Sequence, residues 1–167
     1  MSGEGTSHGT AQLVIEGPGE ARALEFKAFL FPLVGPATAD LPAPPGAAWH
    51  DAAGRPTLLH FAPGRFLAPV PTAELARHLA ALEAARVGSL FDVNGKWRVL
   101  AVTGHGAERL LAAGADVEAM LQHRDCAALT LFDCPVVVAR APGGYALFAY
   151  ASYAQDLRAS LERLRPR

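Results

Sequence analysis

The sequence predicts an α+β fold in which two pseudo-symmetric, ferredoxin-like halves form one compact domain. Three observations lead to this prediction. Short apolar segments alternate with turns rich in Gly and Pro, several longer segments have apolar residues at helical spacing, and the two halves of the chain resemble each other. We expect a flexible tail over residues 1–10 and a single domain over 11–165, within which 11–86 and 97–165 form an internal repeat.

The first half is predicted to contain a strand, a helix, a long loop, a hairpin and a second helix. The strands are expected over 11–16, 57–61 and 65–70, the helices from Glu20 to Leu30 and from Thr72 through an apolar stripe that reaches Leu82, and the Pro-rich loop over 36–56. Asn94-Gly95, a dipeptide typical of tight hairpins, is predicted to join a strand over 89–93 to a return strand over 97–102.

The second half is predicted to follow a similar order. A short helix is expected around 109–111, strands over 127–132, 136–140 and 145–150, and a last helix that begins with a capping box of Ser152 and Gln155.

The repeat rests on two aligned blocks. Residues 13–19 match 100–106 with an offset of 87 residues, and residues 57–66 match 136–145 with an offset of 79 residues. The longer Pro-rich loop of the first half accounts for the difference between the offsets.

Composition narrows the class of protein. The chain has 167 residues, of which 51% are hydrophobic and 19% charged, and its 16 acidic residues nearly balance its 15 basic ones. This balance argues against a disordered chain and against a nucleic-acid partner. The apolar stretch 28–35 is too short to span a bilayer, and residues 1–5 do not resemble a secretory signal. We therefore expect a cytoplasmic protein with no membrane partner.

Two Gly-x-Gly turns, 17–19 and 104–106, each follow a predicted strand and precede a predicted helix, which is the setting of a phosphate-binding loop. The dinucleotide fingerprint requires a third small residue where this chain has Arg22 and Arg109. Long side chains there would prevent close packing of helix and strand. We therefore interpret both segments as tight turns.

The titratable residues do not form a recognisable catalytic or metal-binding pattern. Structural zinc requires four ligands, whereas Cys126 and Cys134, with His123 nearby, stand among apolar neighbours and are interpreted as small buried side chains. The other candidates are interpreted as follows: His50-Asp51 as a loop pair, Asp92 and Asp133 as turn residues, and Arg158, Arg163, Arg165 and Arg167 as a solvated helix face. We predict no catalytic, cofactor-binding or metal-binding residue in this chain.

Aromatic residues crowd the last predicted strand and the helix after it. They are Tyr145, Phe148, Tyr150 and Tyr153. Large side chains on both faces of one strand allow two interpretations: the strand is central and covered on both sides, or one face meets another protein. These four residues are our candidates for a partner interface.

Several segments resemble the gamma subunit of heterotetrameric sarcosine oxidase. They are 58–67, with the sequence Leu-Leu-His-Phe-Ala-Pro-Gly-Arg-Phe-Leu; 87–121, which includes Leu90-Phe91-Asp92-Val93 and Gly104-His105-Gly106-Ala107; and 126–131 with 136–140. The resemblance extends over residues 11–164. It implies a fold similar to the N-terminal part of the T-protein of glycine cleavage, the folate-binding aminomethyltransferase.

The resemblance also implies that a functional segment of the T-protein is missing. In that enzyme, a Gly-Gly turn and paired aspartates follow the strand equivalent to Thr130-Leu131-Phe132. Here the chain continues through Asp133-Cys134-Pro135 into Val136. The stand-alone folate-binding relatives also carry a Lys-Gly-Cys-Tyr string, which this chain lacks. The implied protein has the scaffold without the carboxylates of the transfer reaction.

The implied role is that of a non-catalytic structural subunit in a complex that oxidatively demethylates sarcosine to glycine, forming methylenetetrahydrofolate and hydrogen peroxide. The implied partners are the large alpha subunit and the beta and delta subunits; FAD, FMN, NAD and tetrahydrofolate are implied for those subunits and no cofactor for this chain. A related oxidase with another N-methyl substrate fits equally well. Two alternatives stay open: a stand-alone folate-binding or aminomethyltransferase-like one-carbon protein, and a regulatory module that binds a small ligand between its halves.

Overall fold

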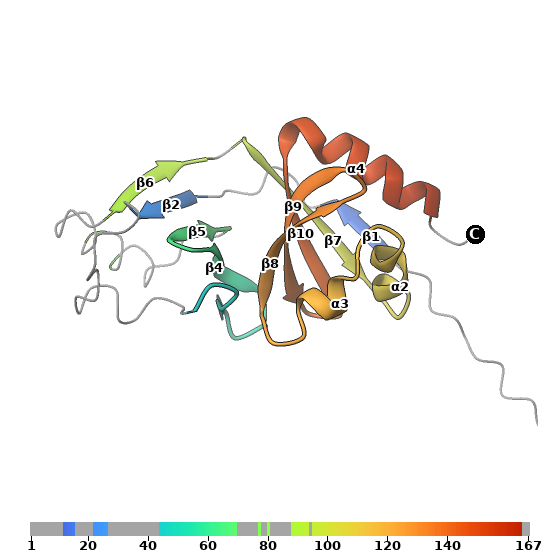
Figure 1. The fold of residues 1–167 in the computed structure, drawn as a ribbon, viewed down its shortest axis with the longest axis horizontal. Helices are drawn as coiled ribbons and strands as arrows, with labels where there is room; N and C mark the ends of the chain where they lie inside the picture. The colour runs from blue at the N-terminus through green and yellow to red at the C-terminus, as the bar shows by residue number, and fades with distance from the viewer. Residues whose placement is uncertain are drawn as a thin grey trace, which may run out of the picture.

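A computed structural model of the chain describes residues 12–15, 22–26, 44–69, 77, 80, 88–93 and 95–164. Its described part contains two antiparallel sheets of five strands each (Figure 1). The first sheet has the order β1 (Gln12–Ile15), β7 (Trp97–Thr103), β10 (Gly144–Tyr150), β9 (Cys134–Ala141) and β8 (Cys126–Leu131). The second sheet has the order β3 (Ala48–His50), β4 (Pro56–Ala62), β5 (Arg65–Ala68), β2 (Arg22–Phe26) and β6 (Gly88–Asp92). The predicted α+β class is confirmed.

The two sheets exchange their edge strands. β1 belongs to the N-terminal part of the chain but pairs with β7 in the first sheet, whereas β6 directly precedes β7 in the sequence but pairs with β2 in the second sheet. The remaining strands follow the same order in both sheets, β7-β10-β9-β8 in one and β2-β5-β4-β3 in the other. β1 and β6 therefore occupy the same position in their sheets.

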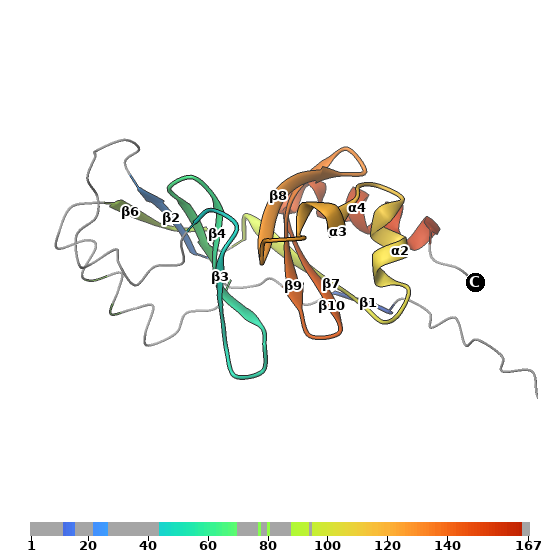
Figure 2. The same cartoon turned by 60° about the horizontal axis from the view of Figure 1, so that its bottom comes forward.

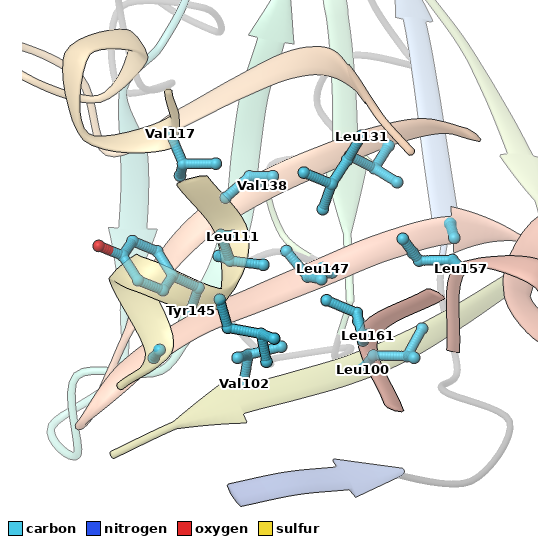
Figure 3. Close-up of a cluster of buried hydrophobic side chains, with 14 of the residues drawn as sticks. Leu100, Val102, Leu111, Val117, Leu131, Val138, Tyr145, Leu147, Leu157 and Leu161 are labelled. Carbon is cyan, nitrogen blue, oxygen red and sulfur yellow. The ribbon is translucent and has the colours of Figure 1, made fainter. Parts of the chain in front are cut away.

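Helices cover one side of the first sheet. They are α2 (Ala107–Ala112), α3 (Val117–Met120) and α4 (Ala151–Leu164), and Figure 2 shows all three on the side of this sheet that faces away from β3 and β4. Leu157 and Leu161 of α4 are fully buried and point toward Leu100 and Leu147 of the sheet (Figure 3). This apolar spacing along α4 is what the sequence predicted for the last helix.

A second core lies between the two sheets. It combines Leu59 and Leu67 of the second sheet with Val99, Val137 and Phe148 of the first. Since β10 is central and successive side chains of a strand point to opposite faces, β10 contributes to both cores. One side of β10 packs under the helices and the other packs against the second sheet.

Backbone hydrogen bonds join the sheets at one end. The carbonyl oxygen of Gly46 accepts bonds from the amides of Asp125, at 2.7 Å, and Cys126, at 3.0 Å. The amide of Ala48 donates to Asp125 Oδ2 at 3.1 Å. The start of β3 is thereby bonded directly to the start of β8.

Three sequence predictions for the first half are wrong. The helix predicted from Glu20 to Leu30 is strand β2 over Arg22–Phe26, because β5 and β6 satisfy its backbone from both edges. The Pro-rich loop over 36–56 contains strand β3. Asn94-Gly95 is predicted to join two strands of one hairpin, but β6 and β7, the strands on either side of it, join different sheets. The Lys96 amide donates to Val93 O at 3.0 Å.

Some predictions lie outside the described residues. They are the tail over 1–10, most of the helix from Thr72, the part of the loop before residue 44, and the Gly17–Gly19 turn. Among the helices that the structure describes, none is both long enough and apolar enough to cross a membrane.

Candidate partner-binding surface

The structure divides the four aromatic candidates into two pairs. Tyr145 and Phe148 are 6% and 1% exposed, so they belong to the cores on either side of β10 and cannot meet a partner directly. This corrects their assignment as interface candidates. Tyr150 and Tyr153 are 37% and 42% exposed. They lie where β10 continues directly into α4 (Figure 1).

Tyr150 is held in place by Trp97. The two residues are register partners on β10 and β7, and their ring centroids are 4.4 Å apart at an interplanar angle of 30°. Trp97 is only 6% exposed, and the amide of Ala151 donates to Lys96 O at 2.7 Å. The Tyr150 ring is therefore exposed yet preorganised, which lowers the entropy cost of binding through it.

Tyr153 lies beside the turn between β8 and β9. Cys134 Sγ is 3.9 Å from the Tyr153 carbonyl oxygen. The turn itself is the two residues Phe132 and Asp133, since Leu131 and Cys134 are register partners. Asp133 of this turn and Asp156 of α4 are exposed, as are Tyr150 and Tyr153.

The two turn residues have positive φ values, 51° for Phe132 and 63° for Asp133. Aspartate adopts this region readily, but a bulky side chain does so rarely. Packing explains the phenylalanine: a Cβ built on Gly114 would lie 2.7 Å from Cε1 of the Phe132 ring. The ring thus occupies the space that a side chain at residue 114 would fill, and Asp133 is left at the tip of the turn.

Both cysteines are buried free thiols. Burial, with a smaller effect of the Asp125 charge, raises the pKa of the Cys126 thiol to about 12. Burial also raises the pKa of Cys134, as do the nearby charges of Asp156 and Asp133. Within the described ranges, no three His, Cys, Asp or Glu side chains gather in a way that could hold a metal ion.

Sequence reasoning missed one polar cluster, which joins α3 to β9 and β10. Arg140 donates from both Nη atoms to Glu118, at 3.0 and 3.1 Å, and also to Leu121 O at 3.2 Å. The Tyr145 hydroxyl donates to the same Glu118 carboxylate. These bonds, first those from Arg140 and then the one from Tyr145, lower the pKa of Glu118, whereas burial and Glu118 raise the pKa of Tyr145.

The charged and hydrogen-bonding groups of this cluster are paired with one another, since Glu118 accepts from both Arg140 and Tyr145. Arg140 lines two open hollows of about 350 and 310 Å³, one shared with His105 and Tyr145 and the other with His123 and Arg124. Because the Arg140 guanidinium is already bonded to a carboxylate and a carbonyl, we interpret the cluster as a clamp that fixes α3 on the sheet.

Replacing Glu118 with glutamine is expected to lower the free energy of unfolding at pH 7 by less than about 1 kcal/mol, since solvent screens this partly exposed pair. The pKa of Glu118 is lower in the folded protein than in the unfolded chain. Its stabilisation is therefore full above the unfolded value and lost as the pH falls through the folded value. Urea titrations from pH 7 to pH 3 should show the wild-type and Glu118→Gln curves converge at low pH. The Asp156→Asn variant, with an exposed acid on α4, is the control; an equal pH response in both variants would contradict the clamp.

The remaining sequence candidates have local structural roles. Asp51 accepts the backbone amides of Arg55 and Ala53 at 2.9 Å each and the side chain of Arg55 at 2.8 Å. These bonds, first the one from the Arg55 amide, lower the pKa of Asp51. Asp51 therefore shapes a turn next to the exposed His50. In the second Gly-x-Gly segment, 104–106, the Gly104 amide donates to the carbonyl oxygen of Gly143 at 3.0 Å. This bond connects the segment to the turn between β9 and β10.

The C-terminal arginines that the structure describes interact along α4. Arg158 donates to Glu162 at 2.7 Å and Arg163 to Ser160 at 3.1 Å. These local bonds agree with a solvated helix face. Arg165, Arg167 and the Asp92 side chain lie outside the described part of the chain.

Comparison with known proteins supports the fold. No protein-family model and no curated protein matches the sequence. Among solved structures, the chain is similar to a chain of the heterotetrameric sarcosine oxidase from Corynebacterium sp. U-96, in complex with pyrrole 2-carboxylate, with a TM-score of 0.73 and 19% sequence identity. The alignment covers 92% of this chain and 83% of that chain. The two chains therefore share a fold over most of their lengths.

Proposed function

We propose that the chain is a non-catalytic structural subunit of a heterotetrameric oxidase related to sarcosine oxidase, in the position of its gamma subunit. The observation that carries this proposal is the structural likeness over 92% of this chain to a chain of such a complex. Its partners are then the large alpha subunit and the beta and delta subunits. FAD, FMN, NAD and tetrahydrofolate belong to those partners, and the substrate of the complex is sarcosine or a related N-methyl amine.

The connection between β8 and β9 supports the non-catalytic role. The resemblance to the T-protein implies that paired aspartates follow the strand equivalent to β8. In this chain a two-residue turn, Phe132-Asp133, leads straight into Cys134, which pairs with Leu131. Such a turn is the shortest common hairpin connection, so it leaves no further residues to carry a second carboxylate.

Co-expression with candidate alpha, beta and delta subunits tests this function. We expect a tagged copy of the chain to co-purify with the alpha subunit, and we expect assembly of the complex to fail when the chain is omitted. Size-exclusion chromatography with light scattering measures assembly, and sarcosine-dependent hydrogen peroxide production measures turnover. A complex that assembles and turns over normally without this chain would refute the proposed function.

The isolated chain provides the test against a one-carbon enzyme. Titration calorimetry with tetrahydrofolate should show no binding, because the proposed role places the folate site on another subunit. Micromolar binding, or processing of a one-carbon substrate by the purified chain, would support the alternative of a stand-alone folate-dependent protein and overturn the non-catalytic role.

A further inference from the structure

Strand β8 is the last strand of the first sheet, so among the described residues no strand pairs with its outer edge (Figure 2). None of its residues is charged and none is a proline. Its register with β9 is unbroken from Cys126 to Leu131. Natural edge strands usually carry a lysine, a proline or a bulge that hinders pairing with another strand. β8 has none of these, so its outer edge is suited to accept a further strand.

The register identifies the backbone groups of β8 that point away from β9. Leu131 and Cys134 are register partners on either side of a two-residue turn, so their backbones are bonded to each other. Bonded and non-bonded pairs alternate along an antiparallel ladder. Counting back from Leu131, the N–H and C=O groups of Ala128 and Thr130 belong to non-bonded pairs and therefore point to the outer edge.

Two hydrogen bonds at the start of β8 support this alternation. The carbonyl oxygen of Asp125 accepts the Arg140 amide at 3.0 Å, on the side of β9. The next residue, Cys126, donates its amide to the carbonyl oxygen of Gly46 at 3.0 Å, on the opposite side. The first outward position of the edge is thus already bonded to another segment of this chain.

The next two outward positions are available to a partner. Ala128 and Thr130 are exposed, and within the described ranges no hydrogen bond engages their outward backbone groups. Each offers one donor and one acceptor, which matches the backbone of an extended chain laid along the edge. Leu129 lies between them and packs partly against the core under the helices. An added strand can therefore place an apolar side chain beside Leu129.

Gly46 decides between possible occupants of this edge. In a two-fold dimer, β8 would pair antiparallel with β8 of a second copy. Bonding at both outward positions requires Ala128 of one copy to lie opposite Thr130 of the other. Gly46 of each copy, bonded at Cys126, would then occupy the space of Phe132 in the other copy. A separate extended segment carries no such obstacle and can bond at both positions.

Resting on the proposed function, we infer that an extended segment of the large partner subunit adds a strand to the outer edge of β8 and bonds to the backbone of Ala128 and Thr130. The contact is made mainly through backbone hydrogen bonds, and apolar contact with Leu129 fixes the register of the added strand. Because β8 has no charged residue, the affinity at this edge should depend little on salt.

The first test measures the affinity of the full chain for the purified alpha subunit. Thr130→Pro removes an outward N–H group and places a ring where the added strand would bond, so it should weaken binding at least roughly tenfold. Proline is tolerated on an edge strand when the missing N–H faces solvent, so the pairing of β8 with β9 is preserved. The matched control, Thr130→Val, keeps the amide and the shape and should bind like the wild type.

Hydrogen exchange of the wild-type chain provides a second measurement that does not depend on a variant. The amides of Ala128 and Thr130 should exchange fast in the free chain and become protected when the alpha subunit binds. Those of Ala127 and Leu129 are bonded to β9 and should be protected in both states. Thermal melts of the free variants show whether Thr130→Pro is folded.

The outcomes separate this inference from the proposed function. If the wild-type chain binds no oxidase subunit, the proposed function fails. If it binds, but the Ala128 and Thr130 amides gain no protection or a folded Thr130→Pro binds as tightly, the function stands and the assignment of this edge is overturned. Equal losses with Thr130→Pro and Thr130→Val would overturn the backbone contact. A free wild-type dimer in light scattering that Thr130→Pro converts to a monomer would make a second copy the occupant and overturn the assignment to the partner subunit.

Discussion

Replacing Gly144 with alanine is expected to lower the free energy of unfolding by about 3 kcal/mol, at the upper end of the usual cost of overpacking. Gly144 begins β10 between Thr103 of β7 and Ala141 of β9. A Cβ at this position would lie 2.1 Å from the carbonyl oxygen of Val102 and 3.0 Å from Cα of Thr103. Both are backbone atoms, so the strands themselves must separate to relieve the contact. Urea unfolding followed by circular dichroism measures the loss.

The neighbouring Gly143 provides a matched control. It has a φ of +73°, and a Cβ there would meet no atom within 4 Å. Gly143→Ala should therefore lower the free energy of unfolding by about 1–2 kcal/mol, which is the cost of holding alanine in the left-handed backbone conformation. If both variants lose the same stability, the close approach of β10 to β7 does not determine the cost at residue 144. A Gly144→Ala variant as stable as the wild type would contradict the geometry of this strand pair.

The second half of the fold could be predicted closely from its sequence. The expected strands over 97–102, 136–140 and 145–150 correspond to β7, β9 and β10, with boundaries that differ by two residues or fewer. Each strand is apolar and contains β-branched or aromatic residues, and β7 and β9 end at turn signals, so local pattern and tertiary pairing agree.

In the first half, the strands expected over 11–16, 57–61, 65–70 and 89–93 correspond to β1, β4, β5 and β6. Strand β2 could not be predicted in the same way, because non-local pairing decided it. Leu24 and Phe26 are spaced by two, as in a strand, yet together with later apolar residues they also fit a helix. The choice is made by β5 and β6, which lie about 40 and 65 positions further along the chain and pair with the two edges of β2. The exchange of β1 and β6 between sheets is likewise invisible to a local pattern.

The candidate site was also predicted only in part from the sequence. The sequence identified an unusual concentration of aromatics but could not separate the buried Tyr145 and Phe148 from the exposed Tyr150 and Tyr153, because a central strand and an interface strand carry similar side chains. The clamp was missed for another reason. Its bonds join Glu118 to residues 22 and 27 positions away, and no spacing rule connects them.

Replacing Phe148 with alanine should lower the free energy of unfolding by about 3–5 kcal/mol. Phe148 is 1% exposed and lies in the core between the sheets, with Leu59 and Leu67 on the other side. Truncation leaves a cavity that the two sheets cannot close without moving toward each other, since each is fixed by its own ladder of hydrogen bonds. Urea unfolding gives the loss of stability. Tryptophan emission of the folded state, measured in a Trp49→Phe background so that Trp97 is the remaining tryptophan, reports the core itself, because Trp97 belongs to the same cluster.

Leu147→Ala distinguishes the two sides of β10. Leu147 is fully buried but points toward the helices, so its truncation should cost a comparable 2–5 kcal/mol while leaving the Trp97 emission of the folded protein unchanged. Tyr153→Ala, at an exposed position, should change stability by no more than about 0.5 kcal/mol. If Phe148→Ala leaves the tryptophan emission unshifted, or if it costs no more than Tyr153→Ala, the second sheet does not pack on the first through this residue. The small loss expected for Tyr153→Ala beside the two large ones follows from burial, because Leu147 and Phe148 are buried and Tyr153 is exposed, while all three substitutions remove a large side chain within seven residues of one another.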